Sequence, residues 1–198
     1  MTELERSLRQ VALDLETLDR RFAAVGGLAV SIRAEPRLTR DVDVALSVVD
    51  DADAEYVINA LRGRGYEVFA IVEQEASGRL STVRLIRRGD EAGFVTDLLF
   101  ASSGVESEIV EAADDVEVLP GLVLPVATIG HLIVMKLLAR DDRRRPNDAD
   151  DLRALATEAT PADWEQALQA AQLVHERGFG HERDLVELVD ELRRDGAW

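Results

Sequence analysis

The chain has 198 residues, enough for one domain with a small extension, and 46% of them are hydrophobic, which is sufficient for a packed core. The absence of cysteine excludes disulfides and thiol catalysis, and a formal net charge of −16 disfavours nonspecific binding to nucleic acid or to anionic membranes. No stretch approaches the roughly 20 apolar residues of a membrane span, and the charged N-terminal segment lacks the apolar run of a signal peptide, so we expect a cytoplasmic protein without a membrane partner.

The first part of the chain mixes helical and strand patterns. Apolar residues recur every three or four positions near the start, which predicts an amphipathic helix, and valine-rich alternation later predicts strands. Asp50 or Asp51 is a plausible N-cap for the helix that follows them. In chain order we expect a helix over 3–21, a strand over 22–25, a helix from the glycines at 26 and 27 to 35, a strand over 41–48, a helix over 50–62, strands over 66–73, 79–88 and 93–101, and two short strands within 115–126.

After Pro125 the spacing of apolar residues predicts almost only helices. Helices are expected over 128–140, 147–158, 161–177 and 183–194. The sequence therefore predicts an α+β fold in which a mixed sheet with flanking helices, residues 1–122, is followed by a C-terminal helical bundle, residues 123–198, packed on that core.

Two aspartates, Asp41 and Asp43, lie inside an apolar strand. Residues two apart on a strand face the same way, so both carboxylates project together. At about 4 Å they would repel by about 1 kcal/mol in water and by about 4 kcal/mol at the effective dielectric of a protein surface. A divalent cation such as Mg²⁺, which binds carboxylate and phosphate oxygens, would offset this repulsion. Two solvated aspartates at a strand edge are the alternative.

Other residues near this pair favour the metal interpretation. Gly26 and Gly27 end one strand and open a helix, whose free N–H groups can receive a phosphate; an ordinary tight turn is the alternative. Asp97 lies in the apolar segment "FVTDLLF", where it could also be a salt-bridged or strand-end residue. Together the three acids and the glycine pair describe a two-metal site for phosphoryl transfer.

The segment "GGLAVSIRAEPRLTRDVDVAL" resembles the nucleotidyltransferase superfamily with the polymerase beta-like fold, and most closely its AbiEii/AbiGii-type toxin branch. In that branch a glycine pair, an Arg-x-Thr stretch and Asp-x-Asp follow one another. The resemblance implies a nucleotidyltransferase-like sheet, and it implies that Asp41 and Asp43 ligate Mg²⁺ or Mn²⁺, with Asp97 as the third carboxylate. It assigns binding of the nucleoside triphosphate to Gly26, Gly27, Arg37 and Thr39.

Lys136 is the single lysine of a chain with 22 arginines. Lysine is a compact point charge and arginine a planar fork, so a lysine can persist where arginine cannot serve; chance survival is the alternative. The segment "VMKLLARDDRRRPNDADDLRAL" resembles a later motif of the same branch. This resemblance implies that Lys136 contacts the nucleotide phosphates and that Asp148 or Asp151 orients it. Each aspartate could instead be an ordinary first-turn acid of a helix.

Several further arginines could bind substrate or form salt bridges. For those on or beside adjacent strands, Arg79, Arg84, Arg87 and Arg88, we expect salt bridges, with binding of a nucleotide or an acidic acceptor as the alternative. The basic run at residues 143–145 could contact substrate phosphate or form a solvated loop.

The remaining polar candidates are expected to be structural. His131, His175 and His181 lack metal-ligand spacing with acids. Ser102 and Ser103 are expected to cap the helix that follows them.

The leading hypothesis from these observations is a metal-dependent nucleotidyltransferase that moves a nucleoside monophosphate from a nucleoside triphosphate to an acceptor. Resemblance to the toxin branch points to tRNA as the acceptor and to a cognate antitoxin as a partner, whereas the net acidity argues mildly against a large RNA footprint. Two alternatives remain open: transfer to a small molecule, as in antibiotic-modifying relatives, and a non-catalytic nucleotide-binding or regulatory protein that keeps the fold.

Overall fold

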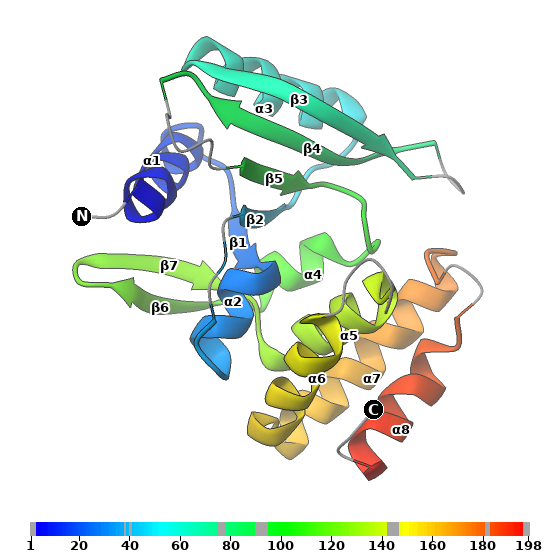
Figure 1. The fold of residues 1–198 in the computed structure, drawn as a ribbon. Helices are drawn as coiled ribbons and strands as arrows, with labels where there is room; N and C mark the ends of the chain where they lie inside the picture. Colours follow the sequence, from blue (N-terminus) through cyan, green and yellow to red (C-terminus); the bar gives the residue numbers. More distant parts are fainter. Residues whose placement is uncertain are drawn as a thin grey trace.

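The computed structural model describes residues 3–37, 39, 41–74, 78–89, 95–141, 147–180 and 183–195. Its strands form one seven-stranded sheet in the order β3-β4-β5-β2-β1-β7-β6 (Figure 1). The strands are β1 (Phe22–Val25), β2 (Asp41–Leu46), β3 (Tyr66–Glu73), β4 (Leu80–Arg87), β5 (Val95–Leu99), β6 (Asp114–Leu119) and β7 (Leu122–Val126).

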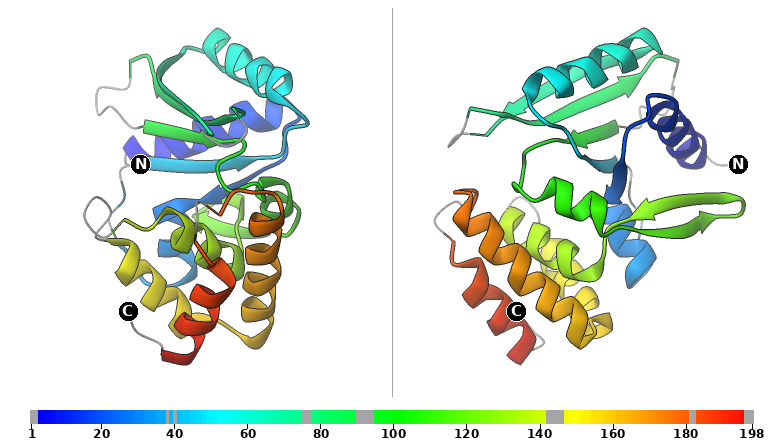
Figure 2. Two further views of the ribbon diagram at one scale, coloured as in Figure 1. Left: turned by 90° about the vertical axis from the view of Figure 1, so that its right-hand side faces the viewer. Right: turned by 180° about the vertical axis from the view of Figure 1, so that it is seen from behind.

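Helices cover the sheet and form a bundle at one end. Figures 1 and 2 show α5 to α8 gathered together, away from the end of the molecule that carries β3 and α3. The helices are α1 (Glu3–Thr17), α2 (Gly26–Arg33), α3 (Asp51–Gly63), α4 (Glu106–Glu111), α5 (Ile129–Ala139), α6 (Asn147–Glu158), α7 (Pro161–Glu176) and α8 (Leu185–Asp195).

The sheet is mixed, and its centre is built around β2. Strand β2 pairs antiparallel with β1 and parallel with β5, and β4 pairs antiparallel with β5. Strand β1 in turn pairs in parallel with β7. The two ends of the sheet are antiparallel hairpins, β3–β4 and β6–β7. The centre of the sheet therefore brings together strands that are far apart in the sequence.

Two hydrophobic cores lie on opposite faces of this sheet. One joins α1 and α3 to apolar residues of β2, β4 and β5, such as Val44, Leu85 and Leu98. The other joins α2 and α4 through α8 to the opposite face, through residues such as Val25 and Ala45. The side of the central strands that faces α2 and α5 is therefore distinct from the side that α1 and α3 cover.

The expected α+β architecture with a helical C-terminal part is confirmed. Most element boundaries lie within a few residues of the prediction, and Asp50 is the N-cap of α3, accepting a hydrogen bond from the Asp53 backbone N–H at 2.9 Å. Strand β7 begins at Leu122, where we divided the chain; that division into two parts stays a prediction. Within the described residues, no helix is both long enough and apolar enough to cross a membrane.

Candidate active site

Strand β2 presents its acidic residues on one face and its apolar residues on the other. Val42 and Val44 are buried in the core beneath α1 and α3. Because side chains alternate along a strand, Asp41 and Asp43 project from the opposite face, together with Ala45, which packs in the core beneath the helical bundle. The structure thus places the two carboxylates on one face of β2, as the alternation of apolar and acidic residues predicted.

A cross-strand row extends this acidic face over four strands. Asp43 lies opposite Val25 of β1 and opposite Asp97 of β5, and Asp97 lies opposite Arg84 of β4. Residues directly opposite on paired strands have Cβ atoms roughly 4.5–5.5 Å apart, close enough for their side chains to interact. The register therefore places two carboxylates and one guanidinium side by side on the face that the helices α2 and α5 cover.

Arg84 is the cation of this row. Its Nε donates to Asp97 Oδ1 at 2.8 Å and its Nη2 to Oδ2 at 2.7 Å, a two-point ion pair. These hydrogen bonds, with added attraction from Asp97, Asp41 and Asp43, raise the pKa of Arg84 above its ordinary value. All three predicted acids are therefore close enough to attract the Arg84 guanidinium. A salt bridge of Arg84 was predicted from the sequence, but its partner Asp97 was not.

Gly26 allows Asp43 to approach the start of α2. Its φ of +64° is in the left-handed region that favours glycine, and an added Cβ would lie only 1.8 Å from Asp43 Oδ2. A side chain at this position would collide with the carboxylate. The glycine thus sets the beginning of the helix directly against one of the predicted metal ligands.

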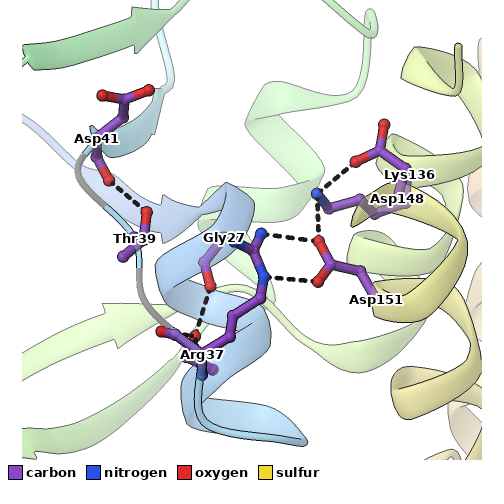
Figure 3. A network of polar contacts seen from close by, with 8 residues as sticks. Gly27, Arg37, Thr39, Asp41, Lys136, Asp148 and Asp151 are labelled. Carbon is purple, nitrogen blue, oxygen red and sulfur yellow. Dashed lines mark hydrogen bonds and ion pairs between the residues drawn. The ribbon is translucent and has the colours of Figure 1, made fainter. Parts of the chain in front are cut away.

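A second charged cluster, on the helices, surrounds Lys136. The Lys136 Nζ lies 2.8 Å from Asp148 Oδ1 and 2.7 Å from Asp151 Oδ2. Arg37 binds the same Asp151 with two donors, Nε to Oδ1 at 2.6 Å and Nη2 to Oδ2 at 2.8 Å. Figure 3 shows Arg37 and Lys136 approaching Asp151 from different elements. Both aspartates contact the lysine, and the choice of one of them as the functional acid stays open.

Gly27 and Ser31, which are both on α2, hold Arg37 against this helix. A Cβ at Gly27 would lie 2.5 Å from Arg37 Nη2, so the guanidinium packs directly on the glycine backbone. The Ser31 hydroxyl lies 2.9 Å from the Gly27 carbonyl oxygen and 3.2 Å from the Arg37 carbonyl oxygen. The space beside the Gly27 Cα is therefore filled by the Arg37 guanidinium.

A cavity of about 260 Å³ joins the two charged clusters. Four of the predicted site residues line it: Gly26, Asp43, Asp97 and Lys136. Its apolar wall comes mainly from α5, and hydroxyl groups come from β4 and from the loop after β5. The other lining residues are Val25, Thr82, Leu99, Ser102, Ser103, Leu132, Met135, Leu138 and Ala139.

The remaining predicted site residues lie around the cavity rather than in its described lining. Thr39 donates from Oγ1 to the Asp41 carbonyl oxygen at 3.1 Å, and Asp41 lies apart from the cluster of Lys136 (Figure 3). Gly27, Arg37 and the two helical aspartates belong to the cluster of Lys136. Their assignment to the nucleotide stays a prediction.

The expectation that Ser102 and Ser103 cap a helix is wrong. The N-cap of α4 is Val105, which makes no capping bond through its side chain. Instead the backbone N–H and hydroxyl groups of both serines donate to Glu106 Oε1 at 2.6–2.9 Å. The acid of the first helical turn therefore holds the serine loop, because one carboxylate oxygen accepts several donors at once.

The other arginines mostly form ion pairs, as expected. Arg79 contacts Asp51 at 3.3 Å, Arg88 contacts Glu67 at 2.5 Å, and Arg87 lies over the Tyr66 ring. Residues 143–145, which carry the basic run, lie outside the described residues, as does His181.

His131 is a buried structural histidine. Its Nδ1 lies 3.0 Å from Thr128 Oγ1, and its exposed fraction is 4%. Burial lowers the pKa of His131 to about 4, with a small opposing effect from Glu108. The ring is therefore neutral near pH 7.

Two of the acids on the sheet, Asp41 and Asp43, are a suitable pair of ligands for a divalent ion. Mg²⁺ is commonly held by one or two carboxylates together with substrate phosphates, and Asp41 and Asp43 on one face of β2 offer such a pair. Both oxygens of Asp97, however, are bound by Arg84. Among the described residues, no group of three or more His, Cys, Asp or Glu side chains is arranged to hold a metal. Asp97 could serve as a third ligand beside this ion pair with Arg84, because each carboxylate oxygen can bind more than one partner.

The fold is similar to that of a solved adenylyltransferase. The lincosamide antibiotic adenylyltransferase LnuA, solved with lincomycin bound, shares 15% identity at a TM-score of 0.50, over 78% of this chain and 98% of its own. JHP933 from Helicobacter pylori shares 17% identity at a TM-score of 0.45, over 96% and 87% of the two chains. The antibiotic-resistance factor ANT(2'')-Ia shares 15% at a TM-score of 0.45, over 94% and 89%.

The chain belongs to the family described as nucleotidyl transferase AbiEii toxin, type IV toxin–antitoxin system, which it matches over residues 6–198. The family resemblance inferred from the glycine pair and the Asp-x-Asp strand is confirmed. No curated protein matches the chain.

Proposed function

We propose that this protein transfers a nucleoside monophosphate from a nucleoside triphosphate to an acceptor hydroxyl, as a toxin that acts on tRNA. The observation that carries the proposal is the cavity that Gly26, Asp43, Asp97 and Lys136 share. It brings together a helix N-terminus, acids that can hold a metal, and an ammonium group that can offset phosphate charge. Membership of a toxin family supports the biological role and a cognate antitoxin as partner.

In this proposal Asp41 and Asp43 hold Mg²⁺ or Mn²⁺, which supplies positive charge to the phosphate oxygens. The start of α2 at Gly26 offers backbone N–H groups to the phosphates, and Lys136 attracts them from the other side of the cavity. The acceptor oxygen bonds to the α-phosphorus, the bond from that phosphorus to the α,β-bridging oxygen breaks, and pyrophosphate leaves.

Asp97 is the residue of the row that is best placed for the acceptor. It lines the cavity and carries a carboxylate that can take the proton of an attacking hydroxyl. Both of its oxygens are hydrogen-bonded to Arg84. Each carboxylate oxygen can accept more than one hydrogen bond, so an acceptor hydroxyl can donate to Asp97 beside Arg84.

The acceptor has a second candidate, a small hydroxyl-bearing molecule. The net charge of −16 argues mildly against a large RNA footprint, and the apolar wall that α5 gives the cavity suits a small molecule. Binding that weakens steeply as salt concentration rises would favour RNA, because phosphate contacts release counterions.

The experiment is transfer of label from each of the four α-³²P nucleoside triphosphates to total RNA in the presence of Mg²⁺ or Mn²⁺. We expect labelled tRNA with the wild-type protein and none with Asp41→Ala. The matched control is Asp115→Ala, which removes an exposed strand carboxylate on β6 and should label as the wild type does. Absence of labelling in RNA, protein and small-molecule fractions, together with absence of nucleotide binding, would overturn the proposal. Metal-dependent nucleotide binding without turnover would support the non-catalytic alternative.

A further inference from the structure

Among the described residues, the ion pairs around Lys136 join two cations to two anions. Arg37 and Lys136 are the cations, and Asp148 and Asp151 are the anions. Lys136 is 5% exposed and both aspartates are 2% exposed, so solvent screens their interactions poorly. A change of one charge in this cluster therefore alters the potential at the lysine strongly.

Asp151 is shared between the two cations. Arg37 binds both of its oxygens, and Lys136 Nζ lies 2.7 Å from one of them, Oδ2. The lysine ammonium has three N–H donors, and the two carboxylates account for two of them. The third donor can serve an anion in the cavity that Lys136 lines.

Arg37 itself is not placed to contact a ligand in that cavity. Two of its nitrogens bind Asp151, the guanidinium packs against Gly27, and Arg37 is absent from the described lining of the cavity. An arginine with its fork fixed on a buried carboxylate acts on that carboxylate. Its effect on a bound phosphate must therefore pass through Asp151 and Lys136.

We infer that Arg37 is a positioning residue that keeps Lys136 available to phosphate by neutralising Asp151. This inference rests on the proposed nucleotidyltransferase function. Without Arg37, the ammonium would face Asp151 without the cation that now binds both oxygens of this carboxylate. The local potential would become negative, and the lysine would be held by the two acids instead of attracting a triphosphate.

The alternative is that Arg37 or Asp151 binds the nucleotide directly. The two hypotheses predict different triphosphate affinities for the Asp151→Asn variant. If Asp151 contacted the nucleotide, its loss would weaken binding. If Asp151 only competes with phosphate for Lys136, removing its charge should leave triphosphate affinity unchanged or make it tighter. The same change should also restore binding to a protein that lacks Arg37.

The test measures binding of the four α,β-methylene nucleoside triphosphates, with Mg²⁺, by isothermal titration calorimetry. For the analogue that the wild-type protein binds best, Arg37→Met should weaken binding at least about tenfold, the size of effect expected for loss of one charged interaction. Arg37→Met/Asp151→Asn should return to within about threefold of the wild type, and Asp151→Asn alone should bind at least as tightly as the wild type.

A matched control is Arg20→Met. Arg20 forms a similar two-point ion pair with Asp53, at 2.8 and 3.1 Å, and neither residue is among those that line the cavity. This variant should bind the analogue as the wild type does. It reports the effect of removing a partly buried arginine–aspartate pair elsewhere in the fold.

The outcomes separate the inference from the function on which it rests. If the wild-type protein binds none of the four analogues, the proposed function fails. If the wild type binds but Arg37→Met binds within about twofold of it, only the inference fails. A double variant that stays as weak as Arg37→Met, or a tenfold loss in Asp151→Asn, would also overturn it. If Arg37→Met does not fold, Asp151→Asn alone still decides between the two interpretations.

Discussion

The two charged clusters that flank the cavity balance their charge differently. On the sheet, the described side chains Asp41, Asp43 and Asp97 surround a single cation, Arg84. In the described ion pairs of the helical cluster, two cations face two anions, and three of these four side chains are almost fully buried. The sheet cluster is where we propose that a metal ion binds, whereas the helical cluster can direct one ammonium toward an anion.

This difference also follows from where each cluster lies. Asp41 and Asp43 are only partly buried, and the Arg84 side chain is 40% exposed, so water can stabilise unequal charge there. The helical cluster is buried between α2, α5 and α6, where an unpaired charge would be costly. Substitutions in the two clusters should therefore have opposite signatures, with loss of catalysis from the sheet and loss of stability from the helices.

The largest expected effect is that of Asp43→Asn on transfer. The substitution removes a charge that would hold the proposed metal but keeps the shape of the side chain. We expect transfer to fall by about a thousandfold or more, comparable with removing a main electrostatic contributor at an active site. The free energy of unfolding should change little, because Asp43 is only partly buried and the substitution keeps its shape. Steady-state labelling and urea denaturation measure the two quantities, with Asp115→Asn as the control.

The next largest effect is the difference between the losses in free energy of unfolding that Lys136→Met and Arg84→Met cause. Removing Lys136 leaves two buried carboxylates with less positive charge, which should cost about 3–5 kcal/mol in the free energy of unfolding. Removing Arg84 from a partly exposed ion pair should cost about 1 kcal/mol or less. Equal losses in urea denaturation of the two variants would show that the clusters do not differ in the way described.

A smaller effect should appear in the pH dependence of stability, through His131. Burial lowers its folded pKa to about 4, below the ordinary value of 6.5. Between these values the unfolded chain binds a proton that the folded protein does not, so stability falls as pH decreases from about 6.5 toward 4, by at most about 3 kcal/mol.

His131→Asn isolates this contribution, because it cannot titrate and can still place a polar atom near Thr128. Relative to the wild type, the variant should lose less stability over the same pH interval. Parallel curves of unfolding free energy against pH for the two proteins would contradict the assignment.

The sequence predicted those parts of the site that depend on local pattern. Alternation along 41–46 placed Asp41 and Asp43 on one face, and the unusual single lysine pointed to Lys136. The partners of these residues depend on contacts between distant segments. The pairing of Arg84 with Asp97 follows from the register of β4 on β5, which the alternating pattern does not determine.

Arg37 illustrates the same limit in the helical cluster. Resemblance assigned it to the nucleotide, but the structure places its guanidinium on Asp151, 114 residues later in the sequence. The choice between Asp148 and Asp151 could not be made from spacing, because both lie in the first turns of α6 and both reach the lysine. The packing of α2 and α5 against α6 decides these contacts.

The most direct test is a crystal structure with Mn²⁺ and the α,β-methylene nucleoside triphosphate that binds best, with anomalous scattering used to locate the metal. We expect an anomalous peak in contact with the carboxylates of Asp41 and Asp43 and with phosphate oxygens, and Lys136 Nζ within hydrogen-bonding distance of the triphosphate. Bound nucleotide with no manganese at these two aspartates, or with its phosphates remote from Lys136, would contradict it.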